Sequence, residues 1–186
     1  GEESIWQASA AEQRHIKNCI MGMVYQNPIR GLRMEYSAAS NIAEKLIAAG
    51  NRSARHMTER AKELLSAVEI LTSRMGEAPK NFSGGMQQRV QISKALANNP
   101  SLLLLDEVTT GLDLSVQAKV LDLIRKIKAK YGISILLVSH DLAVIRMLAD
   151  RTVVMLDGKI IESGLTDQIL EDPQHAYTQQ LVHSLL

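Results

Sequence analysis

Cysteine is nearly absent from this chain, and long apolar runs are missing altogether. Cys19 is the only cysteine among 186 residues, which excludes a disulfide framework and a thiolate zinc site and favours a reducing compartment. The longest apolar stretches, residues 102–105 and 135–138, are far shorter than the roughly 20 residues that a membrane-spanning helix needs. The first residues, Gly-Glu-Glu-Ser, lack the basic start of a signal peptide. We therefore expect a cytoplasmic protein, with peripheral association at the inner face of the membrane left open.

The chain also lacks an excess of charge of either sign. Its 21 Lys and Arg balance 20 Asp and Glu, for a formal net charge of +1. A nucleic-acid-binding domain is usually strongly basic, so composition gives no electrostatic footprint for that partner. We predict no nucleic-acid ligand.

Length and hydrophobic pattern indicate one α/β domain. A chain of 186 residues suits one domain that can bury a core without disulfides or a structural metal. Residues 41–72 have the apolar spacing of helices, broken at 50–53. After Pro100 an apolar run (102–105), a helical pattern (115–130) and a second apolar run (133–138) predict a βαβ unit with buried parallel strands. Residues 152–156 and 159–162 flank Asp157-Gly158, which predicts a two-residue hairpin, and a polar helical tail follows.

Two carboxylates follow the first of these apolar runs. Asp106 and Glu107 stand where a buried parallel strand ends, and doubly wound sheets bind ligands at that edge. Asp106 would hold Mg²⁺ and Glu107 would act on an attacking water, a division that suits nucleoside triphosphate hydrolysis. Acids are also common turn and cap residues at such junctions, so the pair alone leaves both interpretations open.

A Ser-Gly-Gly turn and a histidine extend this pattern. Ser83-Gly84-Gly85 opens an apolar-periodic helix, where main-chain N–H groups and the helix dipole favour an anion, although many such turns only begin a helix. His140 ends the second apolar run, where a neutral imidazole could donate to a phosphate oxygen or serve only as a cap or core residue.

Together these residues resemble the ATP-hydrolysing subunits of ABC systems. The stretch Ser83 to Arg89 is similar to the family signature, residues 102–107 to the second Walker motif, residues 111–113 to the D-loop, His140 to the switch histidine and residues 25–28 to the Q-loop. The resemblance implies an ATPase that uses ATP and Mg²⁺ and works as a head-to-tail dimer with a second ABC subunit. It implies catalytic roles for Glu107, His140 and Gln26, metal binding by Asp106 and Gln26, and contacts to the nucleotide of the opposite subunit by Ser83, Gly84, Gly85, Gln87 and Asp113.

The same resemblance sets the expected fold class and domain organisation. The fold class is α/β, a truncated P-loop NTPase (ABC ATPase) core with a mostly parallel sheet and a small helical subdomain. Residues 1–186 would form one partial nucleotide-binding domain. Its parts would be a helical subdomain at 27–83, a RecA-like core at 84–162 and a helical tail at 163–186.

Within the family, the chain most resembles the ATP-binding subunit of the bacterial carbon-phosphorus lyase system for phosphonate breakdown. Residues 26–34, 41–42, 162–167 and 172–179 carry this resemblance. It implies the carbon-phosphorus lyase core complex as a partner. The alternative is the ATPase subunit of a di- or oligopeptide importer, whose partner is a membrane permease and which shares the pattern at 111–118.

The chain departs from the family in one large respect, because it has no phosphate loop Gly-x4-Gly-Lys-Ser/Thr. Its only Gly-Lys pair, Gly158-Lys159, falls in the predicted hairpin. Without the loop there is no cradle for the β- and γ-phosphates. We expect the chain to be the C-terminal part of a longer subunit, with an exposed sheet edge and without efficient ATP hydrolysis of its own. A non-catalytic ABC-like interaction module is the alternative. Val108, where the family commonly has proline, should be tolerated.

Overall fold

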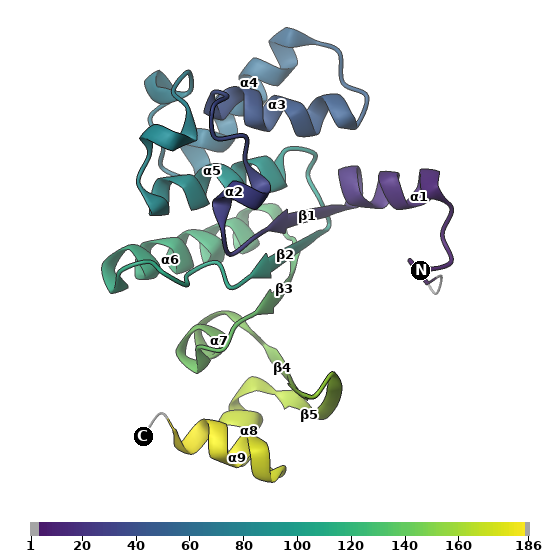
Figure 1. Ribbon diagram of the computed structural model, residues 1–186, viewed down its shortest axis with the longest axis vertical. Coiled ribbons are helices and arrows are strands. Elements are labelled where there is room, and N and C mark those ends of the chain that lie inside the picture. The colour runs from purple at the N-terminus through teal and green to yellow at the C-terminus, as the bar shows by residue number, and fades with distance from the viewer. Residues whose placement is uncertain (1–3, 185–186) are drawn as a thin grey trace. The chain divides into compact units, whose positions relative to one another are not determined.

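Three parallel strands form the sheet of the first part of the chain. The computed structural model describes residues 4–184, which divide into one unit ending at Val138 and a second beginning at Ser139. The first unit holds the strands β1 (Met21–Val24), β2 (Leu102–Asp106) and β3 (Ser134–Val138) in the order β1-β2-β3 (Figure 1). Among the described residues, β1 and β3 each pair on one side only, with β2. The sheet therefore has two open edges in the part of the chain that is described.

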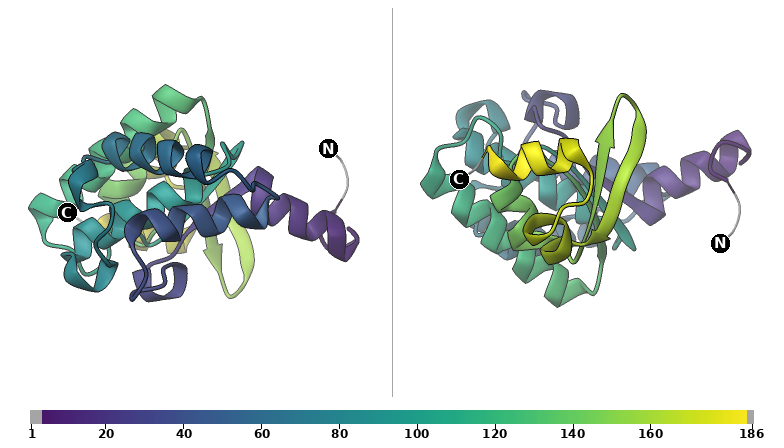
Figure 2. Two further views of the ribbon diagram at one scale, coloured as in Figure 1. Left: turned by 90° about the horizontal axis from the view of Figure 1, so that it is seen from above. Right: turned by 90° about the horizontal axis from the view of Figure 1, so that it is seen from below.

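Helices make up most of the rest of the first unit. Its α-helices are α1 (Ala10–His15), α2 (Pro28–Gly31), α3 (Ala38–Ala48), α4 (Ala54–Ala67), α5 (Gly84–Leu96) and α6 (Leu114–Tyr131). Shorter turns are a π-helix at Ile16–Ile20 and 3₁₀ turns at Thr72–Arg74 and Pro79–Asn81. Helices α3 and α4 lie side by side (Figure 2), and both contact α5. The helices predicted within 41–72, with their break at 50–53, are confirmed as α3 and α4.

The predicted βαβ unit is confirmed as β2, α6 and β3. Strands β2 and β3 pair in parallel, with Leu103 opposite Ile135 and Asp106 opposite Val138. Helix α6 begins where the Asp113 side chain accepts a hydrogen bond from the Val116 N–H and ends at Gly132, whose φ of 60° is the left-handed conformation that glycine accepts readily. Sequence therefore determines both ends of this helix.

The core lies on one face of the sheet. Leu103 and Leu105 of β2 are fully buried, and burial of each leucine side chain contributes about 1.5–3 kcal/mol. Helix α5 approaches β1 so closely that a Cβ on Gly22 would lie 2.6 Å from the Ala95 carbonyl oxygen. Glycine at this position therefore permits the contact between helix and strand.

The expectation that both strands of the βαβ unit are buried is wrong for β3. Leu136 is 58% exposed and Val138 is 55% exposed. Both side chains belong to the face of the sheet opposite the core, because side chains alternate along a strand. An apolar run thus predicts the strand, but only the packing partners decide its burial.

In its described part, residues 139–184, the second unit contains a hairpin and three helices. Strands β4 (Arg151–Leu156) and β5 (Lys159–Leu165) pair in antiparallel fashion around Asp157-Gly158, where both residues have positive φ, as a primed turn requires. The predicted hairpin is therefore confirmed. The helices are α7 (Leu142–Leu148), α8 (Thr166–Glu171) and α9 (Ala176–His183), and the last two form the predicted helical tail. No helix within residues 4–184 is long and apolar enough to cross a membrane.

Candidate active site

Asp106 and Glu107 lie at the carboxyl end of β2, as the sequence predicts. Glu107 has a φ of 45°, which is unusual for a residue with a side chain and costs about 1–3 kcal/mol. Its N–H donates to the Val138 carbonyl oxygen at 2.9 Å, and the Thr110 hydroxyl donates to its carboxylate at 3.3 Å. The strained backbone and these two contacts fix the point at which the glutamate leaves the sheet.

The turn after Glu107 is anchored in the core and ends at the N-terminus of α6. Val108 is buried, so the residue that replaces the family's proline packs rather than faces a ligand. At the far end of the turn, the Asp113 carboxylate accepts hydrogen bonds from the Val116 N–H at 3.0 Å and the Ser115 hydroxyl at 2.9 Å. These bonds lower the pKa of Asp113 below its ordinary value. The carboxylate caps α6, and its predicted nucleotide contact stays a prediction.

The Ser-Gly-Gly turn packs against this same region. Ser83 caps α5 by accepting a hydrogen bond from the Met86 N–H at 3.4 Å, and the Ser83 residue is exposed. A Cβ on Gly85 would lie 2.4 Å from Cγ1 of Val116, and one on Gly84 would lie 3.5 Å from Leu112. The structure thus brings the turn and the residues around Asp113 together. The glycine at position 85 is needed for packing, a reason that the sequence did not give.

The Gln87 side chain holds the residues that precede the Ser-Gly-Gly turn. Its side-chain amide donates to the carbonyl oxygens of Pro79 at 2.9 Å and Phe82 at 3.1 Å. These bonds hold the segment that leads into Ser83. The predicted contact of Gln87 with a nucleotide stays a prediction.

Two further glutamines, which sequence reasoning missed, hold the main chain at Gln26. Gln91 accepts from the Tyr25 N–H at 2.7 Å and donates to the Tyr25 carbonyl at 3.0 Å. Gln88 donates to the Gln26 carbonyl at 2.9 Å and accepts from Gln91 at 2.8 Å. Both side chains are buried, whereas Gln26 is exposed. The sequence carried a signal for these two residues, because the glutamines are one helical turn apart and have the apolar Val90 and Ile92 beside them. The helix that carries them, α5, is buried on nearly all sides.

Strand register places Gln26 and Asp106 at the same edge of the sheet. Val24, the last residue of β1, pairs with Leu105 of β2. Gln26 follows Val24 by two residues and Asp106 follows Leu105 by one, so both lie at the carboxyl end of their strands. Oxygen ligands from one or two carboxylates, completed by phosphate oxygens, are typical of Mg²⁺ sites. No three His, Cys, Asp or Glu side chains gather into a metal cluster within residues 4–184. The Asp106 carboxylate and the Gln26 amide oxygen have the donor chemistry of such a site, and their binding of Mg²⁺ stays a prediction.

His140 belongs to the second unit, where it is exposed and precedes α7. Its neighbour Asp141 caps that helix, accepting from the Ala143 N–H at 2.9 Å, and the Asp141 N–H donates to the Ser139 hydroxyl at 3.1 Å. These bonds fix the main chain on the C-terminal side of the histidine. Its predicted role toward a phosphate stays a prediction.

The sequence of the chain identifies its family. Residues 2–110, more than half of the chain, match the profile of the ABC transporter family. The chain therefore belongs to this family and is an ABC-type ATP-binding protein, as the motifs predict.

Two curated relatives show where in the family the chain falls. It is 46% identical over 183 residues to the putative phosphonates utilization ATP-binding protein PhnK of Escherichia coli, covering 98% of the chain and 73% of that protein. It is 40% identical over 179 residues to the oligopeptide transport ATP-binding protein OppD of Bacillus subtilis, covering 95% of the chain and 50% of OppD. The chain is thus PhnK-like, and its sequence identity to a peptide-transport ATP-binding protein is only slightly lower.

Solved structures confirm the fold class. The ATP-binding cassette MJ0796, solved as a dimer bound to ADP and Pi, matches with a TM-score of 0.74 and 30% identity over 86% of this chain and 68% of that one. CbiO1 of Clostridium perfringens matches with a TM-score of 0.78 at 22% identity, over 88% of this chain and 64% of that one, which supports the fold alone. The described residues are therefore a part of an ABC ATPase core with a parallel sheet.

Proposed function

We propose that this chain is the part of an ATP-hydrolysing ABC subunit that carries its catalytic base and its signature turn. In this proposal Glu107 accepts a proton from the attacking water, His140 donates to a phosphate oxygen, and Gln26 orients the water. Mg²⁺, when bound, would neutralise phosphate charge, and Asp106 and Gln26 would hold it. Ser83, Gly84, Gly85, Gln87 and Asp113 would face the ATP of a second subunit.

The observation that carries the proposal is the fixed position of Glu107. Its carboxylate leaves the end of β2 from a left-handed backbone held by Val138, and Thr110 contacts the carboxylate itself. Strain of this kind persists only where surrounding contacts impose it, and it is concentrated at functional sites. These contacts hold the Glu107 carboxylate at the end of β2, where the proposal needs the base.

The ATP site of this proposal takes its phosphate loop from outside the 186 residues. No Gly-x4-Gly-Lys-Ser/Thr motif is present in them. The same observation favours a second candidate, a non-catalytic module that presents Ser83 to ATP bound elsewhere. The two candidates differ in whether Glu107 is needed for turnover.

We further propose that the machine driven by this ATPase is the carbon-phosphorus lyase system. The 46% identity to PhnK supports this choice, and the 40% identity to OppD supports a peptide permease as the alternative. Expression of the whole gene in E. coli lacking PhnK tests the choice. Restored growth on a phosphonate as sole phosphorus source supports it, and failure of a well-expressed protein to restore growth contradicts it.

A mixing experiment tests the head-to-tail arrangement. Two variants of the protein encoded by the whole gene, Glu107→Gln and Ser83→Arg, are each expected to lose ATPase activity. In a head-to-tail dimer, one site takes Glu107 from one subunit and Ser83 from the other. A mixed dimer therefore contains one site with both defects and one intact site. Because half of randomly mixed dimers are heterodimers, the mixture should recover about a quarter of the wild-type rate.

The controls make the result decisive. Glu59→Gln changes an exposed carboxylate on α4 and should be as active as the wild type, alone or mixed. Recovery in the mixture of the two inactive variants supports sites shared between subunits. If the mixture stays as inactive as its components while size-exclusion chromatography shows dimers, the shared site is wrong.

A further inference from the structure

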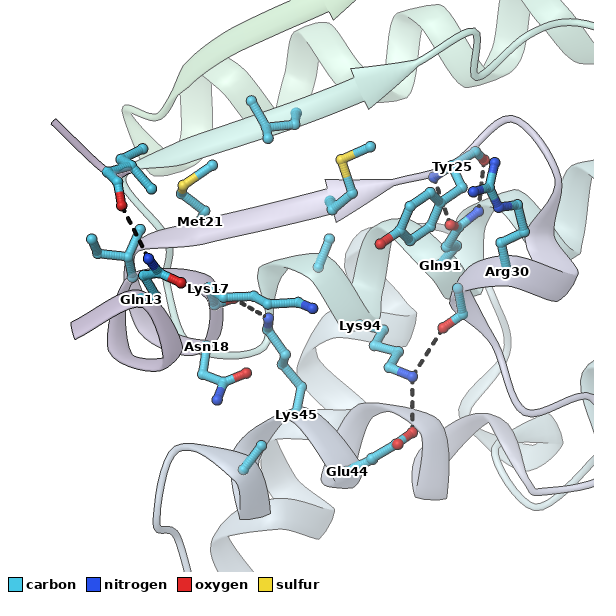
Figure 3. A pocket seen from close by; sticks show the side chains of 17 residues that line it. Gln13, Lys17, Asn18, Met21, Tyr25, Arg30, Glu44, Lys45, Gln91 and Lys94 are labelled. Atoms are coloured by element: carbon cyan, nitrogen blue, oxygen red, sulfur yellow. Dashed lines mark hydrogen bonds and ion pairs between the residues drawn. The ribbon is translucent and has the colours of Figure 1, made fainter. Parts of the chain in front are cut away.

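Helix α5 holds both ends of the short segment that contains Gln26. At the start of the segment, Gln91 accepts a hydrogen bond from the Tyr25 N–H at 2.7 Å and donates to the Tyr25 carbonyl oxygen at 3.0 Å (Figure 3). At its end, the Lys94 ammonium donates to the Gly31 carbonyl oxygen at 2.9 Å. A Cβ on Gly31 would lie 2.2 Å from Oε1 of Gln91, so the main chain passes very close to this glutamine. The segment is therefore fixed to one helix at both ends.

The two buried glutamines of α5 form a complete hydrogen-bond network with this segment. Gln88 donates to the carbonyl oxygens of Gln26 at 2.9 Å and Tyr25 at 3.3 Å. Gln91 donates to the side-chain oxygen of Gln88 at 2.8 Å as well as to Tyr25, so both N–H groups of each side-chain amide are used. Gln88 is 2% exposed and Gln91 is 1% exposed. A buried polar network in which every group is satisfied is rigid and specifies one geometry.

The side chain of Gln26 has no such support. It is exposed, and among residues 4–184 its amide makes no hydrogen bond. The next residue, Asn27, caps α2 by accepting a hydrogen bond from the Ile29 N–H at 3.0 Å, so the chain turns into a helix directly after Gln26. The position of the Gln26 side chain is thus set by the place at which α5 holds its main chain.

We propose that Gln88 and Gln91 are positioning residues of the ATPase, which act on the reaction through Gln26. The proposal rests on the proposed function, in which Gln26 orients the attacking water. Neither glutamine touches the reacting atoms. Both hold the main chain at the carboxyl end of β1, so that the Gln26 amide is presented at the edge of the sheet where β2 ends. A misplacement of about 1 Å by a change far from the chemistry can slow a reaction about 100-fold, so loss of either anchor should slow turnover.

A double-mutant cycle in the protein encoded by the whole gene separates positioning from stability. Gln91→Met keeps a side chain of similar length but removes every hydrogen bond to Tyr25 and Gln88. It should lower kcat by about tenfold or more, and Gln26→Ala should lower it at least as much. Rates are expressed per ATP bound at saturation, so that unfolded protein does not contribute. The double variant should have the kcat of Gln26→Ala alone, because Gln91 acts only through the Gln26 amide.

Ser93→Ala is the matched control. Ser93 is also buried on α5, but its hydroxyl contacts the Leu64 carbonyl oxygen of α4 at 3.3 Å and not the Gln26 segment. This variant should lose stability in urea and keep the wild-type kcat. Hydrogen-exchange mass spectrometry gives a measurement that does not depend on turnover. The peptide 25–31 should exchange faster than the wild type in Gln91→Met and at the wild-type rate in Ser93→Ala.

The outcomes distinguish this proposal from the one on which it rests. If Gln26→Ala hydrolyses ATP at the wild-type rate, the role of Gln26 is wrong, and the positioning proposal is wrong with it. If Gln26→Ala is slow but Gln91→Met has the wild-type kcat, only the positioning proposal is wrong. Losses that multiply in the double variant would also overturn it, because Gln91 would then act independently of Gln26. If Gln91→Met does not fold, Gln88→Met, which leaves the bonds between Gln91 and Tyr25 in place, replaces it with the same expectations.

Discussion

Replacement of Gly85 by alanine should destabilise the first unit, because the added methyl group has no room. Gly85 is buried in the first turn of α5, and its Cβ would lie 2.4 Å from Cγ1 of Val116. Real Cβ atoms essentially never approach another atom so closely. Valine in a helix strongly prefers a single χ1 rotamer, so the methyl group of Val116 cannot rotate away at low cost. Helix α5 or α6 must shift instead.

The expected change in the free energy of unfolding follows from two opposing effects. Overpacking of a well-packed contact costs about 1–3 kcal/mol. Alanine recovers up to about 1 kcal/mol, because it favours the helix over glycine. The two ranges give a net loss of up to about 3 kcal/mol, with a central value of about 1.5 kcal/mol, measured by urea unfolding of the 186-residue chain monitored by circular dichroism.

Gly84→Ala is the matched control. Its Cβ would meet Leu112 at 3.5 Å, an ordinary contact, and Gly84 is exposed. This variant should be as stable as the wild type or up to about 1 kcal/mol more stable. The double variant Gly85→Ala with Val116→Ala should lose less stability than the sum of the single changes. Equal stability of Gly85→Ala and the wild type, or equal losses of stability at both glycines, would refute the conclusion that the Ser83-Gly84-Gly85 turn packs on α6.

Two further predictions concern hydrogen bonds in the two units. Gln91→Leu leaves the N–H and carbonyl of Tyr25 without their partner, so urea unfolding should show a loss of about 1–3 kcal/mol, and hydrogen exchange at the Tyr25 amide should accelerate. Slow exchange at Tyr25 in that variant would show that Gln91 does not hold this segment. In the second unit, the Glu162 carboxylate accepts from the main-chain N–H groups of Gln174 and His175, at 2.8 Å and 3.0 Å, and the bond from Gln174 above all lowers the pKa of Glu162 below its ordinary value. Its stabilising effect is complete above the ordinary pKa and is lost as the pH falls through the lowered one. The amide NMR shifts of Gln174 and His175 should therefore change in that acidic range, and Glu162→Gln should abolish the change. A transition that persists in Glu162→Gln would assign it to another group.

Where local signals and periodicity were strong, the sequence was sufficient to predict the fold. The apolar run at 102–105 and the helical spacing after it predicted β2 and α6, and Asp157-Gly158 predicted the hairpin, because these patterns depend on neighbours in sequence. Strand β1 was missed. Its sequence, Met-Gly-Met-Val, is short, and it contains a glycine that the approach of α5 explains only once the two elements are packed. Helix α1 had a readable signal in Ser9 and Glu12, which form a capping box.

The candidate site, like the fold, could be predicted only in part from the sequence. The residue types that point to phosphate chemistry, such as Asp106, Glu107 and Ser83, are visible in the sequence as motifs at strand ends and helix starts. The positive φ of Glu107 and the glutamines that hold Tyr25 depend on contacts between elements far apart in sequence. No local pattern encodes such contacts, so tertiary packing alone reveals them.

The most direct test of the account is the turnover number for ATP of the protein encoded by the whole gene, compared with its Glu107→Gln variant. If Glu107 is the general base, turnover should fall by about 100-fold or more, since a positioned base contributes that much. Glu59→Gln, at an exposed carboxylate that pairs with Lys62 at 3.3 Å, should retain the wild-type value. Undiminished turnover in Glu107→Gln would contradict the assignment of the base at the end of β2 and, with it, the proposed mechanism.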